Sequence, residues 1–516
     1  MNIGPLATPL PNGPDWVRDA VFYQIFPDRF ASSRRVPKPG PLEDWYAPPT
    51  THGFKGGDLL GVAEHLDELH ELGITALYLT PVFASASNHR YHTFDYAKVD
   101  SLLGGDAALR ELLEAAHARN MRVILDGVFN HASRGFWPFH HVLENGAASP
   151  YRDWFYLDPE VLSGQRGLIA YPGLDQAAER DFGYQAWWDL PALPKLNHSN
   201  PAVREYIYGV AEHWLRFGID GWRLDVPEEI GEPGFWEEFR RRCLAVKPDA
   251  YLVGEIWNPA AEWLAGRRFH GLMNYPLAET ILSFVGAGRL DAALVAKTHE
   301  YALHVRPIDG TEFGRQLTSV MATYAPEVAS LQLNLLDSHD TARFISLAGG
   351  DANALRLAAL IQMTLPGAPC IYYGDELGLE GREDPDCRRA YPWDPAGQDR
   401  VMRDFYAGLI ALRHAEPVVR HGRFQLLGSV DSAVAYGMFG PENSDRSIIV
   451  AINAGDRPAR LELELPNLAG RAVAQIAWPG DRWGTTISAR NIEAGRLAID
   501  ICAREGLALA LGHGSS

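Results

Sequence analysis

Residues 221–236 read GWRLDVPEEIGEPGFW, a stretch in which a short apolar run carries one arginine and one aspartate and is followed by helix breakers and acids. The run predicts a β-strand over 219–225. Side chains alternate across a strand, so Arg223 and Asp225 share one face. The pair is either a structural ion pair or the start of a reaction site at the strand end.

Similar apolar, β-branched runs recur through the first three quarters of the chain, and most precede a segment with helical period. Eight strands are predicted, at 20–26, 74–80, 122–127, 219–225, 251–255, 269–273, 331–337 and 368–373. Helices are predicted between them, such as one over 59–72 with Gly73 as its stop and one that Asn200 caps and Pro201 begins. This alternation predicts an α/β fold with a closed (β/α)8 TIM barrel, and an open doubly wound sheet is the alternative.

Two segments interrupt the alternation. Residues 130–200 are too long and too rich in aromatic, proline and glycine residues for a usual strand-to-helix connection, which predicts an inserted domain after the third strand. From about residue 418, alternating runs such as SIIVAIN and GLALALG predict a C-terminal antiparallel β-sandwich. The expected organisation is therefore barrel (1–129), inserted domain (130–200), barrel (201–417) and β-sandwich (418–516).

Composition excludes several classes of protein. The 516 residues hold 47 Lys and Arg against 65 Asp and Glu, a formal net charge of −18, which disfavours nucleic acid and acidic membrane surfaces as partners. No apolar run reaches the roughly 20 residues of a transmembrane helix, and the first residues, MNIGPLATPLPNGPDW, lack the features of a signal peptide. The four cysteines are widely spaced and form no CxxC pair. We expect a cytoplasmic protein with a neutral or cationic small-molecule substrate.

Further polar residues stand at the predicted strand ends. Asp126 ends the third strand, with Asn130 and His131 just beyond it. Glu255 ends the fifth strand, and His339 and Asp340 follow the seventh. Because the carboxyl ends of barrel strands meet on one rim, four such acids indicate a reaction site rather than a single structural pair.

Two of these acids differ in their sequence neighbours. Arg223 is expected to lower the pKa of Asp225, and the apolar neighbours Ile256 and Trp257 are expected to raise that of Glu255. One ionised and one protonated carboxyl group suit a retaining glycoside hydrolase, in which they act as nucleophile and general acid.

The segments DGVFNH (126–131), GWRLDVPEE (221–229), GEIW (254–257) and LLDSHD (335–340) closely resemble the four hallmark regions of the α-amylase family of glycoside hydrolases. The resemblance covers nearly the whole chain and implies catalytic roles for Asp225 as nucleophile, Glu255 as general acid/base and Asp340 as the third carboxylate. It also implies that the substrate is bound by Tyr91, His131, Arg223, Glu229, Trp257 and His339.

Other segments resemble one group within that family. LPKLN at 193–197 and the stretch at 366–393 are similar to the corresponding parts of cyclomaltodextrinases, neopullulanases and maltogenic amylases. The resemblance implies a hydrolase that cleaves α-1,4 bonds of cyclodextrins and maltooligosaccharides. A glucanotransferase, α-glucosidase or glucoside isomerase that uses the same site is the alternative, and a non-catalytic binding subunit is a weaker one.

Three departures from that group affect the expectations. The first barrel strand begins near residue 20, so the N-terminal β-domain of that group and its domain-swapped dimer are not expected. We expect a monomer or a homo-oligomer of another kind. His92 and Pro227 replace the family's usual residues. ASSRRVPK at 31–38 stands where the family has a calcium segment, so no cofactor or required calcium is expected.

Some aromatic and histidine residues stay open at this point. Trp187 and Trp188 fit a sugar platform and the core of the inserted domain equally well. His89, His92, His140 and His141 have no metal-binding spacing, so no metal site is predicted.

Overall fold

The computed structural model describes residues 13–173, 181–441, 446–465, 472–475, 492 and 495–512. Eight parallel strands form the central sheet in the order β8-β7-β6-β5-β2-β1-β10-β9. A bridge between Met273 and Leu333 joins the two end strands, so the sheet closes into a barrel and the open-sheet alternative is wrong. The strands are β1 (Phe22–Ile25), β2 (Ala76–Leu79), β5 (Arg122–Gly127), β6 (Gly221–Leu224), β7 (Tyr251–Gly254), β8 (Gly271–Leu272), β9 (Leu333–Leu335) and β10 (Ala368–Tyr372).

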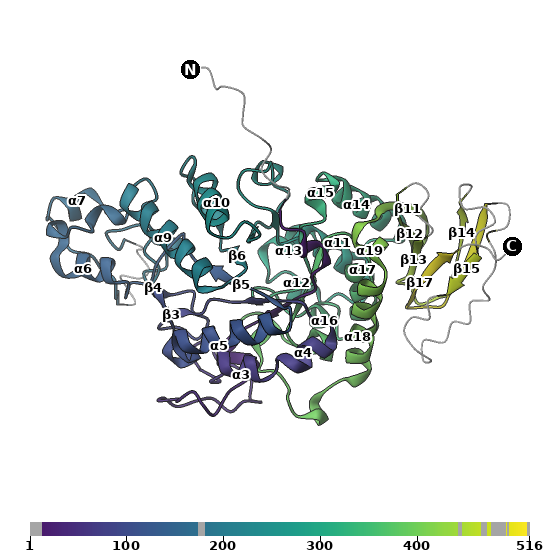
Figure 1. Cartoon of the computed structure of the whole chain (residues 1–516), viewed down its shortest axis with the longest axis horizontal. Coiled ribbons are helices and arrows are strands. Elements are labelled where there is room, and N and C mark those ends of the chain that lie inside the picture. The colour runs from purple at the N-terminus through teal and green to yellow at the C-terminus, as the bar shows by residue number, and fades with distance from the viewer. Residues whose placement is uncertain are drawn as a thin grey trace, which may run out of the picture.

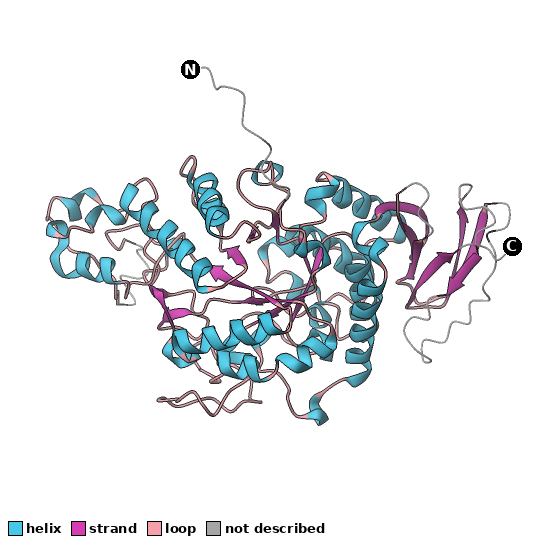
Figure 2. Ribbon diagram, viewed as in Figure 1, coloured by secondary structure: helices cyan, strands magenta, loops and turns pink. Residues whose placement is uncertain are grey.

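All eight predicted barrel strands are present, most of them shorter than predicted. Helices pack around the sheet, and Figure 2 shows them enclosing the strands. They include α3 (Leu59–Glu64), α4 (Leu66–Leu72), α5 (Gly105–Ala118), α9 (Pro201–Phe217), α10 (Phe235–Val246), α11 (Tyr275–Val285), α14 (Gly310–Ala322), α17 (Ala352–Thr364) and α18 (Arg400–Ala415).

Local sequence explains the ends of these helices. Asn200 caps α9 by accepting a hydrogen bond from the Ala202 amide at 2.8 Å, as predicted. Gly73 ends α4 with a φ of 95°, a left-handed conformation that suits glycine. The helix predicted over 59–72 is interrupted at His65, whose φ and ψ of −112° and 15° are not helical.

The segment between β5 and α9 lies at one end of the molecule (Figure 1). It contains α6 (Trp137–Asn145) and α7 (Pro159–Leu162), and its aromatic side chains pack on one another. The Ser133 amide hydrogen-bonds to the Thr93 carbonyl, so the segment also contacts the hairpin β3 (Phe83–Ser85) and β4 (Thr93–Val99). This arrangement places the predicted inserted unit against the rim of the barrel.

The C-terminal strands lie at the opposite end (Figure 1). One antiparallel sheet contains β11 (Arg423–Val430), β12 (Ala433–Phe439), β13 (Ser447–Asn453), β17 (Glu505–Gly512) and β15 (Ala472–Gln475). A second contains β14 (Ala459–Glu464) and β16 (Arg496–Ile501). Leu461, Ile499 and Leu509 belong to one buried cluster that the two sheets share, so the predicted sandwich is present. In the described parts of the chain, no helix has the length and apolar character to span a membrane.

Candidate active site

The carboxyl ends of neighbouring barrel strands bring the predicted acids together. Asp126 lies at the end of β5, and Asp225 and Glu255 directly follow β6 and β7. All three are buried, with exposed fractions of 1%, 6% and 5%. Asp340 lies in the loop after β9, and its side chain remains 33% exposed. The arrangement therefore combines three enclosed carboxyl groups with one that faces outward.

Arg223 is the centre of the cluster. Its fully buried guanidinium forms ion pairs with Asp126 at 2.9 Å, Asp225 at 2.8 Å and Glu255 at 2.9 Å. A single guanidinium thus bridges the carboxyl groups of Asp225 and Glu255, which directly follow the neighbouring strands β6 and β7.

The expected role of Arg223 in separating two pKa values is wrong, because the guanidinium pairs with both acids. Burial raises the pKa of Asp225 well above its ordinary value, with Arg223 opposing the shift and Glu255 adding to it. Burial also raises the pKa of Glu255, again against Arg223. Both carboxyl groups therefore have raised pKa values, and their other contacts distinguish them.

Those other contacts differ between the two acids. Glu255 accepts hydrogen bonds from the Trp257 indole at 3.3 Å and from the Val226 amide at 3.1 Å. Asp225 has one oxygen on Arg223, and its second oxygen, Oδ2, has no hydrogen-bond partner among the described residues. An oxygen without a partner keeps its lone pairs available for attack on carbon.

Val226 has an uncommon backbone conformation beside these acids. Its φ of 34° and ψ of 54° lie in the left-handed region, which costs a β-branched residue roughly 1–3 kcal/mol. In this conformation its amide points at Glu255. The strain is thus located between the two candidate catalytic groups.

His339 lies in a network of polar partners. Gln24 contacts its Nδ1 at 2.8 Å, and Tyr91 and Asp340 contact its Nε2. Burial, helped by Arg388, lowers the pKa of His339 well below its usual value, so the ring is uncharged. Tyr91 stacks on this ring with centroids 5.2 Å apart and donates a hydrogen bond to Asp126 at 2.8 Å.

The remaining predicted substrate-binding residues lie around this cluster. His131 is buried, burial lowers its pKa to about 3, and its Nε2 has no partner in the described structure. Glu229 lies on the turn η5 (Pro227–Glu229), 42% exposed and paired with Lys195 at 3.0 Å. Trp257 stacks on Tyr275 at 3.6 Å. All nine predicted residues therefore belong to the rim at the carboxyl ends of the strands or its adjoining loops.

The structure adds residues that sequence patterns did not single out. Arg388 donates to the His339 carbonyl at 2.9 Å and approaches Asp340 at 3.5 Å. Tyr78 donates to Asp126 at 2.7 Å from within β2. Gln24 and Tyr78 are polar side chains inside otherwise apolar strands, and that was the available signal for them.

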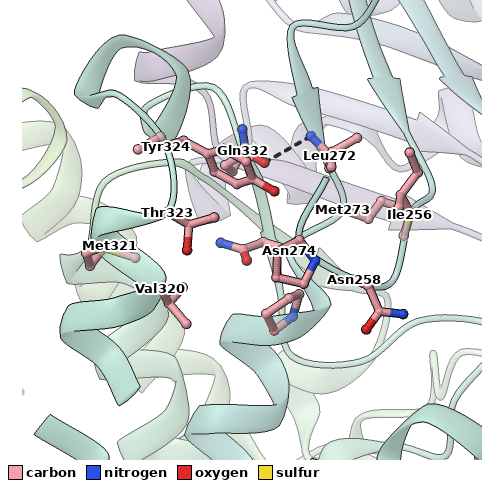
Figure 3. Close-up of a pocket in the computed structure, with 13 residues that line it drawn as sticks. Ile256, Asn258, Leu272, Met273, Asn274, Val320, Met321, Thr323, Tyr324 and Gln332 are labelled. Atoms are coloured by element: carbon pink, nitrogen blue, oxygen red, sulfur yellow. Dashed lines mark hydrogen bonds between the residues drawn. The ribbon is translucent and has the colours of Figure 1, made fainter. Parts of the chain in front are cut away.

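A separate small hollow lies beside this rim (Figure 3). Ile256, Leu272, Asn274, Tyr324 and Gln332 line it, and Gln332 accepts a hydrogen bond from the Leu272 amide. Its lining contains no carboxylate, imidazole or amine, in contrast to the acid-rich rim.

Comparison with known families assigns the fold. The model described as "Alpha amylase, catalytic domain" matches residues 24–416. The chain belongs to the α-amylase family. The match confirms the resemblance seen in the four sequence segments. The named relatives described next are glycoside hydrolases, and the chain is therefore one of this class of enzymes.

Individual members of the α-amylase family resemble the chain over most of its length. A cyclomaltodextrinase of Geobacillus thermopakistaniensis is 39% identical over 454 residues, 88% of this chain and 71% of the relative. Ttha1563 of Thermus thermophilus is 43% identical, with a TM-score of 0.86 and coverage of 97% of this chain and 100% of the other. A debranching enzyme of Nostoc punctiforme is 42% identical, with a TM-score of 0.83 and coverage of 97% and 99%.

Proposed function

We propose that this chain is a retaining α-glucan hydrolase in which Asp225 is the nucleophile and Glu255 the general acid/base. Glu255 gives its proton to the glycosidic oxygen as Asp225 attacks the anomeric carbon, so the bond to the leaving sugar breaks and a glycosyl ester forms. Glu255 then removes a proton from water, which attacks the anomeric carbon and releases Asp225. The observation that carries this proposal is the bridge of Arg223 between the two carboxyl groups.

The surrounding residues suit a sugar ring in the reacting position. Asp340 faces outward and can accept hydrogen bonds from sugar hydroxyls. His131 and His339 are uncharged, so each can donate or accept a hydrogen bond without adding charge to the site. Tyr91 offers a ring edge and face beside them.

The proposed substrates are cyclodextrins and short maltooligosaccharides, cleaved at α-1,4 bonds. The similarity to a named cyclomaltodextrinase supports this choice. Initial rates on β-cyclodextrin, pullulan, starch and maltotriose test it, with β-cyclodextrin and maltotriose expected to react faster than starch. A strong preference for starch contradicts the substrate class and leaves the chemistry in place.

A second candidate is cleavage of α-1,6 branch points by the same residues. The 42% identity to the Nostoc punctiforme debranching enzyme over 97% of this chain favours it. Product analysis on pullulan distinguishes the two, because cleavage at α-1,6 bonds releases maltotriose and cleavage at α-1,4 bonds releases panose.

The proposed location is the cytoplasm. All four cysteines are free thiols, and three of them are buried, which is typical of proteins in reducing compartments. Cell fractionation of the source organism with an activity assay tests this location.

A further inference from the structure

Trp187 and Trp188 lie beside the candidate site, and the structure separates their roles. Trp188 is 76% exposed, so it is no part of a core. Its ring stacks on that of Trp187 at 4.7 Å and 12°. Trp187 in turn stacks on His131 at 4.9 Å and 14°. The three rings form a column that leads from the buried active-site histidine to the surface.

The backbone holds this column in an uncommon conformation. Trp188 and Asp189 have φ values of 53° and 54°, in the left-handed region that non-glycine residues rarely adopt. Hydrogen bonds at 3.0 Å from the Trp187 amide to Leu193 and from the Leu190 amide to Trp187 close the turn around them. The local fold therefore tolerates strain at two consecutive residues while a large apolar ring faces water.

A groove runs along the two tryptophans of the column. Trp187, Trp188, Lys195 and Glu229 are among the residues that line it. The Lys195–Glu229 pair supplies charged hydrogen-bonding groups at one wall, and the buried Trp187 Nε1 has no partner in the described part of the chain. An apolar platform with polar groups at its edge suits a pyranose ring, which has apolar faces and a rim of hydroxyls.

Glu229 connects the groove to the proposed general acid. Glu229 ends the short segment that begins at Val226, and the Val226 amide hydrogen-bonds to Glu255. The proposed general acid stands on the side of the departing oxygen, because it protonates that oxygen. Sugars bound near Glu229 are therefore those that leave, or those that later accept the glycosyl group.

We propose that Trp188, supported by Trp187, is a stacking site for a glucose ring of an α-glucan on the leaving-group side of the cleaved bond. The inference rests on the proposed function and extends it to the choice of leaving group and acceptor. By holding a sugar there, the column favours oligosaccharide leaving groups over small ones. It also favours transfer to a sugar acceptor over hydrolysis.

The test compares two substrates that differ only in the leaving group. α-Maltosyl fluoride places no sugar on the leaving-group side, whereas maltotetraose does. Trp188→Ala is expected to lower kcat/KM on maltotetraose by about ten-fold more than on α-maltosyl fluoride, since it removes one ring-stacking interaction. The ratio of transfer to hydrolysis, with maltose as the added acceptor, is expected to fall in the same variant, and Trp188→Tyr is expected to recover both.

Trp137→Ala is the matched control, because Trp137 is a 61% exposed tryptophan of the same inserted segment and does not line the groove. It is expected to match the wild type on both substrates. Equal losses on both substrates in Trp188→Ala, or no loss on either, overturn the stacking site. A wild-type chain that releases no fluoride from α-maltosyl fluoride overturns the proposed function instead.

Discussion

At the amino end of strand β6, Asp220 contacts two cations and a histidine, whereas at its carboxyl end Arg223 faces three carboxyl groups. Asp220 contacts Lys247 at 2.7 Å, His117 at 2.8 Å and Arg122 at 2.9 Å. Burial favours a higher pKa for Asp220, but hydrogen bonds from His117 and Lys247 outweigh it and bring the pKa below its usual value. At the other end, burial raises the pKa values of Asp225 and Glu255, and the opposing effect of Arg223 is too small to cancel this increase.

The same short strand thus carries a stabilising charge cluster at one end and a destabilising one at the other. Excess cations around one carboxylate favour the folded state, and excess carboxyl groups around one cation oppose it. The second arrangement keeps a proton available at the carboxyl end, where a proton donor is required. The amino end of the barrel therefore serves stability and the carboxyl end serves chemistry.

The largest expected effect concerns the two proposed catalytic acids. Glu255→Gln is expected to lower kcat on maltotriose by about 10²–10⁴-fold, the usual contribution of general acid–base catalysis. The rate of the glycosylation step with α-maltosyl fluoride is expected to fall much less in this variant, since fluoride departs without a proton donor. Burst-phase fluoride release measures that step.

Asp225→Asn is the contrasting variant, because an activated leaving group does not replace a nucleophile. Its kcat is expected to fall by several powers of ten on both substrates. Its thermal unfolding midpoint is expected to stay at or above the wild-type value. A folded Asp225→Asn protein with near-wild-type turnover contradicts the assignment.

The next effect concerns stability at the amino end. Asp220→Asn is expected to lower the free energy of unfolding by about 3 kcal/mol, because it leaves Lys247 and Arg122 without their shared buried carboxylate. Asp249→Asn is the control: Asp249 pairs with Arg122 at 3.1 Å but is 48% exposed, so a loss of less than about 1 kcal/mol is expected. Equilibrium denaturation gives both values, and equal losses contradict the stabilising role of the cluster.

The Asp220 cluster also has a defined pH dependence. The folded pKa of Asp220 is lowered, so its contribution to stability is present above the unfolded pKa of about 3.9 and is lost as the pH falls through the folded value. The difference in unfolding free energy between wild type and Asp220→Asn should therefore be constant near neutral pH and shrink below about pH 4. A difference that persists at lower pH contradicts this prediction.

The smallest expected effect is a shift in the pH profile of activity. Partial burial and the charges of Glu255 and Glu229 raise the pKa of Glu228 to about 7. The ionised Glu228 helps Glu255 to keep its proton, so Glu228→Gln should move the alkaline limb of kcat/KM to lower pH by less than about one unit. Glu232→Gln, on the same loop but paired with Arg204 at 3.1 Å, should leave the limb in place.

Much of the fold could be predicted because periodicity is a local property. The eight barrel strands and the interruption between β5 and α9 follow from runs of apolar residues and their spacing, and so do the C-terminal sheets. The strand ends also predicted which acids share a rim, because parallel strands of a barrel end together. Strand limits were less accurate, as in β8, where only Gly271 and Leu272 of the predicted 269–273 pair as a strand.

Contacts between distant segments could not be predicted in the same way. Arg388 reaches Asp340 from a loop 48 residues further along the chain, and no local pattern marks that approach. Tyr78 is a polar residue within β2, but no local pattern shows that its hydroxyl group reaches Asp126. The exposure of Trp188 depends on the left-handed turn at 188–189, which the local sequence did not predict.

By itself, the sequence determined the barrel, its interruptions and the order of the acids along the rim, because apolar spacing decides which residues are buried and which strand ends meet. Only the tertiary structure decided how charge is shared there. Barrel closure places Arg223 against three carboxyl groups rather than one, and burial then sets their pKa values. Such electrostatic balance depends on distances between segments far apart in the chain, which no local pattern records.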